Sequence, residues 1–290
     1  MLDPTLPDNT PHAHPRPDTP AAAIAALMEG NRAFTHLLAE TGDGAPAIIH
    51  IPVEDLALGH PGVAPLQQPF AAFLGCADAR APVELIFGQP ANNLFVVRVA
   101  GNTLGETGLG SLNFAVERLG TVRLLCVLGH TGCGAVGAAV DAYLTPAAYL
   151  GVAANLPLQA VVSPLLAPVR GAAEALRRAI GEDVAGRPGY RAALIDLTGT
   201  LHAALEAAVL RRAFYSRLGD TLEAVYAVYN LASRRVGRPN PADGDDWQPG
   251  LFTPPDEETG FARLADTLAG SGFIRAMLDR PPGVAPRVAP

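Results

Sequence analysis

The sequence contains no lysine, because all 21 of its basic residues are arginine. This absence excludes a Schiff base to pyridoxal phosphate, a P-loop lysine and a lysine general base. The 28 acidic residues outnumber the basic ones and give a formal net charge of -7 at pH 7. A surface that follows a nucleic-acid backbone needs an excess of positive charge, so we expect no nucleic-acid partner.

Cysteine and aromatic residues are also scarce. The 290 residues include three cysteines and 6% aromatics, although 49% are hydrophobic, so the core must be built mainly from Ala, Val and Leu. An odd number of cysteines in so long a chain does not fit a disulfide scaffold and favours a reducing compartment. The acidic, proline-rich start lacks the basic and apolar regions of a secretory signal. We therefore expect a cytoplasmic protein.

Residues 142–169 contain no charged side chain, a length that suggests a membrane span. The stretch also contains four prolines, which would leave backbone groups unpaired in lipid. These are Pro146, Pro157, Pro164 and Pro168. We therefore expect no membrane span, and we interpret residues 142–190 as an apolar insertion that is buried or forms an interface.

The composition divides the chain into three parts. Residues 1–19 are rich in Pro, Asp and Thr and offer little to bury, which predicts a disordered tail. Residues 20–236 are predicted to form a single α/β domain, with a Gly-, Pro- and Ala-rich linker at 39–68. Residues 237–290 are predicted to be a Pro/Gly-rich extension. It begins with a linker or extended tail at 237–257 and contains one short helix at 260–268.

Apolar runs alternate with helical patterns along the domain, which predicts a small, mainly parallel sheet flanked by helices. The predicted strands are 70–74, 94–99, 122–128 and 222–231, and the predicted helices are 21–38, 82–87, 108–119, 134–141, 169–180 and 191–218. The predicted fold class is therefore α/β.

Two short motifs follow predicted strands. Cys76-Ala-Asp78-Ala-Arg80 follows the first strand, and His130-Thr-Gly-Cys133 follows the third. Two thiolates and an imidazole are preferred ligands of zinc, and the carboxyl ends of neighbouring parallel strands meet at one edge of a sheet. The sequence therefore predicts that Cys76, His130 and Cys133 hold one Zn²⁺ per chain and leave its fourth position open to water.

Asp78 and Arg80 are predicted to act beside this zinc. Extended backbone would turn Asp78 to the same side as Cys76, two residues earlier. Asp78 can then accept a hydrogen bond from zinc-bound hydroxide and orient it, or it can ligate the zinc and close the site. Arg80 can hold Asp78 by paired charge-assisted bonds and so keep the site open.

These residues resemble the β-class carbonic anhydrases. The stretches CADARAPVELIFGQPANNLFVVRVAGN and GSLNFAVERLGTVRLLCVLGHTGCGAV are similar to two blocks of that family, and residues 29–34 resemble its N-terminal helical region. The resemblance implies a zinc lyase, carbonate dehydratase, that interconverts carbon dioxide and bicarbonate. It also implies the family's fold, with Cys76, His130 and Cys133 as ligands and Asp78 with Arg80 as the orienting pair.

Further residues are assigned by the resemblance alone. It implies that Gln67 orients substrate, that Phe95 and Phe114 form apolar walls, and that the backbone N–H of Gly134 faces substrate. It also implies a homodimer or higher homo-oligomer with the site near the subunit interface. In this sequence Phe114 stands where the family commonly has Tyr.

Two other functions fit the same residues. A zinc hydroxide in an apolar pocket can attack carbonyl sulfide or carbon disulfide, and the entrance to the pocket would decide between these substrates and carbon dioxide. Alternatively, Asp78 could close the site and make it a structural zinc in a non-catalytic interaction protein. The presence of both Asp78 and Arg80 favours an enzyme.

Overall fold

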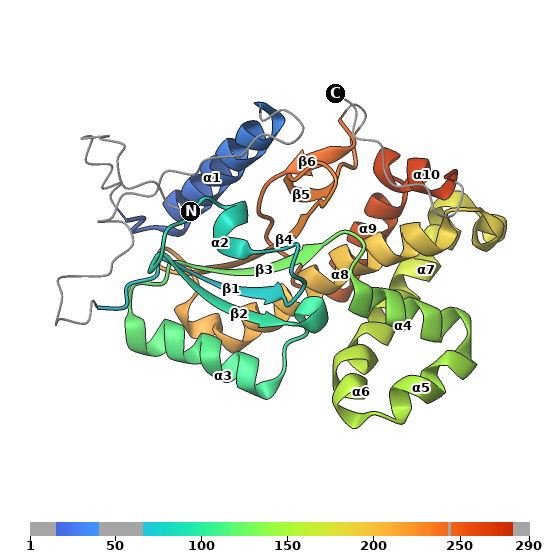
Figure 1. The fold of residues 1–290 in the computed structure, drawn as a ribbon, viewed down its shortest axis with the longest axis horizontal. Coiled ribbons are helices and arrows are strands. Elements are labelled where there is room, and N and C mark those ends of the chain that lie inside the picture. The colour runs from blue at the N-terminus through green and yellow to red at the C-terminus, as the bar shows by residue number, and fades with distance from the viewer. Residues whose placement is uncertain (1–15, 41–65, 243–244, 281–290) are drawn as a thin grey trace.

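The computed structural model describes residues 16–40, 66–242 and 245–280, and within them one sheet has the strand order β2-β1-β3-β4-β5-β6 (Figure 1). The strands are β1 (Ala71–Cys76), β2 (Leu94–Val99), β3 (Leu124–His130), β4 (Glu223–Tyr229), β5 (Val236–Pro239) and β6 (Trp247–Pro249). Strands β1 to β4 are parallel to one another, whereas β4 pairs with β5 and β5 pairs with β6 in antiparallel fashion. The prediction of a mainly parallel sheet is confirmed, whereas 1–15 of the predicted tail and 41–65 of the predicted linker lie outside the described residues.

Helices cover both faces of the sheet, which explains why β1 and β3 are buried along their whole length. One face packs against α1 (Pro20–Glu40) and α2 (Val83–Ile86). The other face packs against α3 (Glu106–Phe114) and α8 (Tyr190–Ala213). Successive strand residues point to opposite faces, so each buried strand contributes to both cores.

The strand ends differ from the prediction by a few residues that matter for the site. Cys76 and His130 were expected to follow their strands, but they are the last residues of β1 and β3. The parallel ladders continue to these positions, where Cys76 pairs with Val99 and His130 pairs with Tyr229. Both side chains are therefore fixed by the sheet itself.

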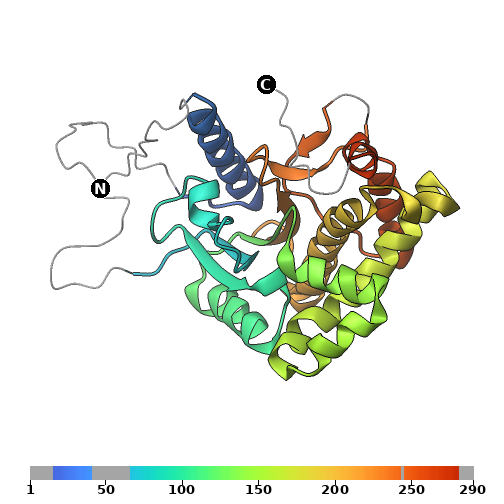
Figure 2. The same ribbon diagram turned by 45° about the vertical axis from the view of Figure 1, so that its right-hand side comes forward.

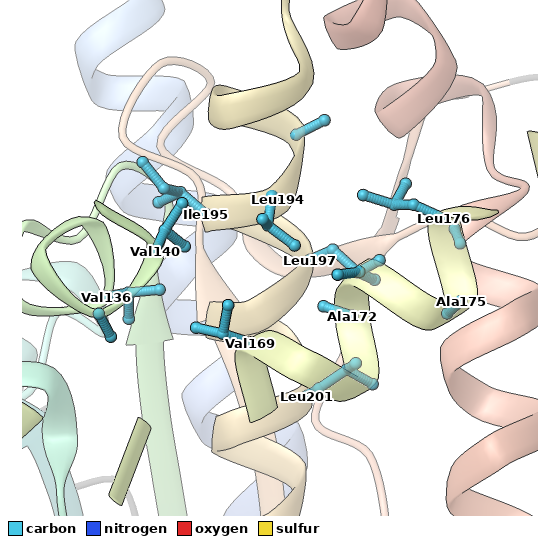
Figure 3. Close-up of a cluster of buried hydrophobic side chains, with 14 of the residues drawn as sticks. Val136, Val140, Val169, Ala172, Ala175, Leu176, Leu194, Ile195, Leu197 and Leu201 are labelled. Atoms are coloured by element: carbon cyan, nitrogen blue, oxygen red, sulfur yellow. The ribbon is translucent and has the colours of Figure 1, made fainter. Parts of the chain in front are cut away.

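The region of the predicted insertion is helical and packs beyond the carboxyl end of β3 (Figure 1, Figure 2). Helix α4 (Gly134–Leu144) leads into it, and it contains α5 (Tyr149–Ala153), α6 (Leu156–Val162) and α7 (Leu166–Ile180), together with the short turns η4 (Pro146–Ala148), η5 (Ser163–Leu165) and η6 (Glu182–Gly186). Buried residues of α4 and α7, including Val136 and Val169, pack against Leu194 and Leu197 of α8 (Figure 3). By contrast, Leu150 is 72% exposed.

Helix α8 is long and apolar enough to cross a membrane, but 89% of its most apolar window is buried inside the protein. Helix α8 is therefore a core helix, packed between the sheet and α7. Helix α8 is shorter than the predicted helix 191–218, because it ends at Ala213 and is followed by the turn η7 (Tyr215–Arg217). Likewise, α3 stops at Phe114, and the π-helical turn η3 (Ala115–Leu119) completes the predicted helix 108–119.

Residues 237–257 are predicted to be a linker or an extended tail, but described parts of this segment pair with the sheet. Strands β5 and β6 lie in this segment and extend the sheet from β4, and α9 (Glu258–Ala269) and α10 (Gly272–Leu278) pack against α7 and α8. The two strands have four and three residues and lack an apolar run, so the sequence pattern does not reveal them. The part of 237–290 that the structure describes is therefore built into the same core rather than set apart as an extension.

The contact between α1 and α2 requires a glycine. A Cβ on Gly30 would lie 1.8 Å from the carbonyl oxygen of Phe87, which is backbone and cannot turn aside. We expect Gly30→Ala to lower the free energy of unfolding by roughly 2–3 kcal/mol, measured by urea denaturation. Gly110→Ala is the matched control, because nothing lies within 4 Å of a Cβ there. Equal stability of the two variants would contradict the prediction.

Candidate metal centre

Three potential ligand atoms converge at the carboxyl edge of the sheet. The ligand atoms of Cys76, His130 and Cys133 all lie within 4.8 Å of one another, and the three residues are buried. Neighbouring strands β1 and β3 supply the first two. Cys133 caps the N-terminus of α4, and the chain reaches it through Gly132, whose φ of 62° favours glycine.

The geometry of this group fits zinc. The two sulfur atoms are 3.9 Å apart, and tetrahedral coordination with Zn–S bonds of roughly 2.3 Å would separate them by about 3.8 Å. Nδ1 of His130 lies 3.0 Å from the carbonyl oxygen of Thr131, to which it donates, so Nε2 carries the lone pair. This Nε2 is buried without a hydrogen-bond partner among the described residues, as expected for a ligand atom.

The pKa values of the two thiols, Cys76 and Cys133, shift in opposite directions. The hydrogen bond from Cys133 lowers the pKa of Cys76, and the same hydrogen bond, together with burial, raises the pKa of Cys133. The backbone N–H of Gly101 also donates to Sγ of Cys76, at 3.3 Å. Negative charge therefore concentrates on Cys76, the sulfur that the sheet fixes in place. By contrast Cys126, the third cysteine, lies fully buried inside β3.

The structure forms the predicted pair of Asp78 and Arg80. Nε of Arg80 donates to Oδ1 of Asp78 at 3.0 Å, and Nη2 donates to Oδ2 at 2.7 Å. These hydrogen bonds hold the pKa of Asp78 well below its usual range, so the carboxylate is ionised. Its Oδ2 lies 3.7 Å from Nε2 of His130. A charged acceptor is thus held beside the three ligand atoms without being one of the group.

Arg98 holds the loop that carries Asp78. Its Nε donates to the carbonyl oxygen of Cys76 at 3.0 Å, and its Nη2 donates to the carbonyl oxygen of Asp78 at 2.6 Å. The sequence favours a structural or anion-pairing role for Arg98 over a catalytic one, and these two contacts are structural. Its signal is an arginine near the carboxyl end of the apolar strand β2, opposite Gly75 in the register.

Asp196 supports the second ligand loop from α8, a role that the sequence analysis did not identify. Its Oδ1 accepts a hydrogen bond from the backbone N–H of Gly132 at 2.7 Å. Burial raises the pKa of Asp196 to about 6. A carboxyl group inside an apolar helix is the signal that could have identified it, because burying such a group is costly unless it has a partner.

Asp196 should make stability depend on pH. Its folded-state pKa of about 6 lies above the usual 3.8, so the folded protein binds more protons between these values than the unfolded chain does. The contribution of Asp196 to stability is therefore present at pH 4 and is lost as the pH rises through 6. Asp196→Asn keeps the acceptor oxygen and should escape this loss, which amounts to about 3 kcal/mol.

Urea denaturation from pH 4 to pH 7 measures the difference between Asp196→Asn and the unchanged protein. Asp245→Asn is a control of opposite sign, because the hydrogen bond from Arg235 lowers the pKa of Asp245. Curves for Asp196→Asn and the unchanged protein that run parallel over this range would show that Asp196 does not titrate as described.

The four predicted substrate-binding residues lie in two places. Gly134 begins α4 beside Cys133, where first-turn N–H groups have no partner within the helix. Phe95 pairs with Ala72 near the start of β1, about 13 Å along the strand from its carboxyl end. The two remaining residues also lie away from the ligand group: Gln67 precedes β1, and Phe114 is the 51% exposed last residue of α3. One chain therefore brings Gly134 to the ligand group, and the roles of the other three stay predictions.

The fold and the three donors define a metal-binding α/β protein whose centre lies at the carboxyl edge of a parallel sheet, beside an aspartate–arginine pair. Residues 71–179 match the family described as carbonic anhydrase. This segment contains both ligand motifs, Asp78 and Arg80. The resemblance of the chain to carbonic anhydrases is therefore confirmed.

Curated relatives cover the same region. Carbonic anhydrase 2 of Mycobacterium tuberculosis is 42% identical over 123 residues, which are 42% of this chain and 54% of that protein. The carbonic anhydrase of Mycolicibacterium smegmatis is 37% identical over 123 residues, with the same two shares. The chain thus spans about half the length of these relatives. A solved structure described as a tetrameric beta-carbonic anhydrase from Sordaria macrospora has a TM-score of 0.45 and 19% identity, and covers 59% of this chain and 80% of that one.

Proposed function

We propose that this protein catalyses the reversible hydration of carbon dioxide to bicarbonate and a proton, with one Zn²⁺ per chain held by Cys76, His130 and Cys133. One observation supports this most strongly: a carboxylate fixed by Arg80 stands 3.7 Å from the free nitrogen of His130. A purely structural site would not need an ionised acceptor held away from the metal. The named activity of the curated relatives points the same way.

The ligand residues and the pair of Asp78 and Arg80 would have separate roles in the proposed reaction. Zinc, when bound, would supply a Lewis acid that lowers the pKa of a water molecule in its fourth position. Asp78 would accept a hydrogen bond at that position and orient its donor, and Asp78 cannot itself donate because Arg80 keeps it ionised. With both oxygens engaged by Arg80, Asp78 is also held back from closing the site.

The N-terminus of α4 is suited to binding the anion bicarbonate. Gly134 is exposed and follows the ligand Cys133 directly, and nothing lies within 4 Å of a Cβ at this position. The free N–H groups and the positive end of the helix dipole stabilise a nearby negative charge. We therefore assign Gly134 to binding bicarbonate through its backbone.

We further propose a homodimer or a higher homo-oligomer in the cytoplasm. Strand β2 forms one edge of the sheet, and its five apolar residues are only partly buried, which leaves a surface suited to a second copy. Phe95 lies on this strand, and Phe114 is exposed, so a partner subunit is where their predicted contact with substrate would arise. The three cysteines are free thiols, which suits a reducing compartment.

Exchange of oxygen-18 between labelled carbon dioxide and water, followed by membrane-inlet mass spectrometry, tests the proposed reaction. The zinc-loaded protein should accelerate loss of the label, and protein stripped of zinc should not. A parallel assay with carbonyl sulfide measures release of hydrogen sulfide. Rapid carbonyl sulfide hydrolysis without oxygen exchange would identify carbonyl sulfide, not carbon dioxide, as the substrate. Inactivity in both assays would contradict an enzymatic role.

A further inference from the structure

A backbone donor reaches the proposed zinc ligand Cys76 from outside the ligand motifs. The N–H of Gly101, in the turn η2 (Ala100–Asn102) that follows β2, donates to Sγ of Cys76 at 3.3 Å. Hydrogen bonds to ligand atoms tune their charge and, through them, the metal. The direction of this N–H therefore matters to the site, and it depends on the conformation of residues 100–104.

This turn has a backbone conformation that needs support. Gly101 and Asn102 have φ values of 69° and 46°, both in the left-handed region, and for Asn102 this carries an energetic cost. The turn is also tightly enclosed: a Cβ on Gly101 would lie 3.0 Å from Cβ of Ala135 and 3.4 Å from Cδ1 of Leu165. Small shifts in its surroundings would therefore change where the N–H points.

Two side chains of α8 supply the support. Oε1 of Glu206 accepts the N–H of Leu104 at 3.1 Å, and the buried ring of His202 interacts with the backbone of Gly101, which raises the pKa of that ring against the effect of burial. The two residues are one helical turn apart and so share a face of α8. Their relative exposures are 2% and 9%. Glu206 thus holds the Leu104 end of the 101–104 segment by a hydrogen bond, and His202 interacts with its Gly101 end.

Burial disfavours the charged form of both His202 and Glu206. Burial raises the pKa of Glu206 to about 7 and lowers the pKa of His202 to about 4. Nε2 of His202 and Oε1 of Glu206 are 3.6 Å apart. An apolar pair would fill the same space without a desolvation cost, but it could not bind the backbone of the segment.

We propose that His202 and Glu206 are positioning residues that clamp residues 101–104 and thereby aim the N–H of Gly101 at the sulfur of Cys76. Neither side chain is one of the ligand group. They affect the metal site indirectly, because the hydrogen bond from the N–H of Gly101 changes the negative charge on the sulfur of Cys76. The inference rests on the proposed metal site, but it does not depend on which substrate that site takes.

Cobalt(II) substitution measures this effect directly, because the thiolate-to-cobalt charge-transfer band reports the energy of the sulfur lone pairs. Glu206→Met has a similar length but cannot accept the N–H of Leu104, whereas Glu206→Gln keeps an acceptor oxygen. We expect Glu206→Met to move the band to longer wavelength and to weaken cobalt binding by roughly tenfold. We expect Glu206→Gln to match the unchanged protein.

Thr198→Val is the control for loss of a buried polar group from α8, because the hydroxyl of Thr198 has no hydrogen-bond partner among the described residues. An unmoved band in Glu206→Met, or an equal shift in Thr198→Val, would overturn the clamp. If Glu206→Met does not fold, His202→Leu provides the same test from the other end of the segment. Cobalt binding requires no turnover, so a shifted band in a protein without hydratase activity would reject the proposed reaction and keep the clamp.

Discussion

A serine at position 133 is expected to leave the protein without bound zinc and without measurable carbon dioxide hydration. Cys133 supplies one of three ligand atoms, and its sulfur lies 3.9 Å from that of Cys76. A serine hydroxyl remains protonated at neutral pH and binds zinc poorly. Loss of a residue that merely supports a ligand costs roughly 10–100-fold in metal affinity, so loss of a ligand should cost at least as much.

Zinc content after dialysis against a chelator measures this effect, together with the rate of hydration. Cys126→Ser is the matched control, because it makes the same chemical change at a buried cysteine outside the ligand group. The control should keep about one zinc per chain, as a single tetrahedral site predicts. Full zinc retention in Cys133→Ser would remove this residue from the metal site.

Asp78→Asn is expected to separate metal binding from catalysis. The three ligand atoms remain, so zinc should stay bound. The amide has one acceptor oxygen where the carboxylate has two, and it carries no charge to pair with Arg80. Orientation at the fourth position should then fail, and we expect kcat to fall by roughly 100-fold or more.

Asp141→Asn is a close control for this substitution. Nε and Nη2 of Arg191 hold Asp141 at 2.6 and 2.7 Å in the same forked arrangement, on an exposed part of α4. It should leave both zinc content and kcat unchanged, as measured by metal analysis and stopped-flow kinetics. An Asp78→Asn protein with normal turnover would refute the orienting role, and one without zinc would make Asp78 a ligand.

The candidate site could be predicted from sequence because its parts are local. Cys76 and His130 end apolar runs that form neighbouring strands, and Cys133 is three residues from His130. The carboxyl ends of parallel strands meet at one edge, so the order of strands and helices was enough to bring the donors together. Arg80 is likewise two residues from Asp78, within reach along the chain.

Other parts depend on contacts that the sequence pattern does not contain. Arg98, Asp196 and Glu206 act on backbone groups that are distant in the chain. Arg98 is the one polar residue of β2, and Asp196 and Glu206 are buried carboxyl groups of the largely apolar helix α8. Strand β5 pairs with β4 and β6 pairs with β5, and neither strand has an apolar run that would identify it from its own residues. Periodicity detects buried faces and does not detect such pairings.

Stopped-flow hydration of carbon dioxide with a pH indicator tests the central claim most directly. The purified protein is assayed at neutral and alkaline pH with about one zinc per chain, the content that a single site predicts. Fast proton release that disappears when zinc is removed and returns when it is restored is the result we predict. Proton release no faster than the uncatalysed reaction at either pH, with zinc bound, would contradict the account.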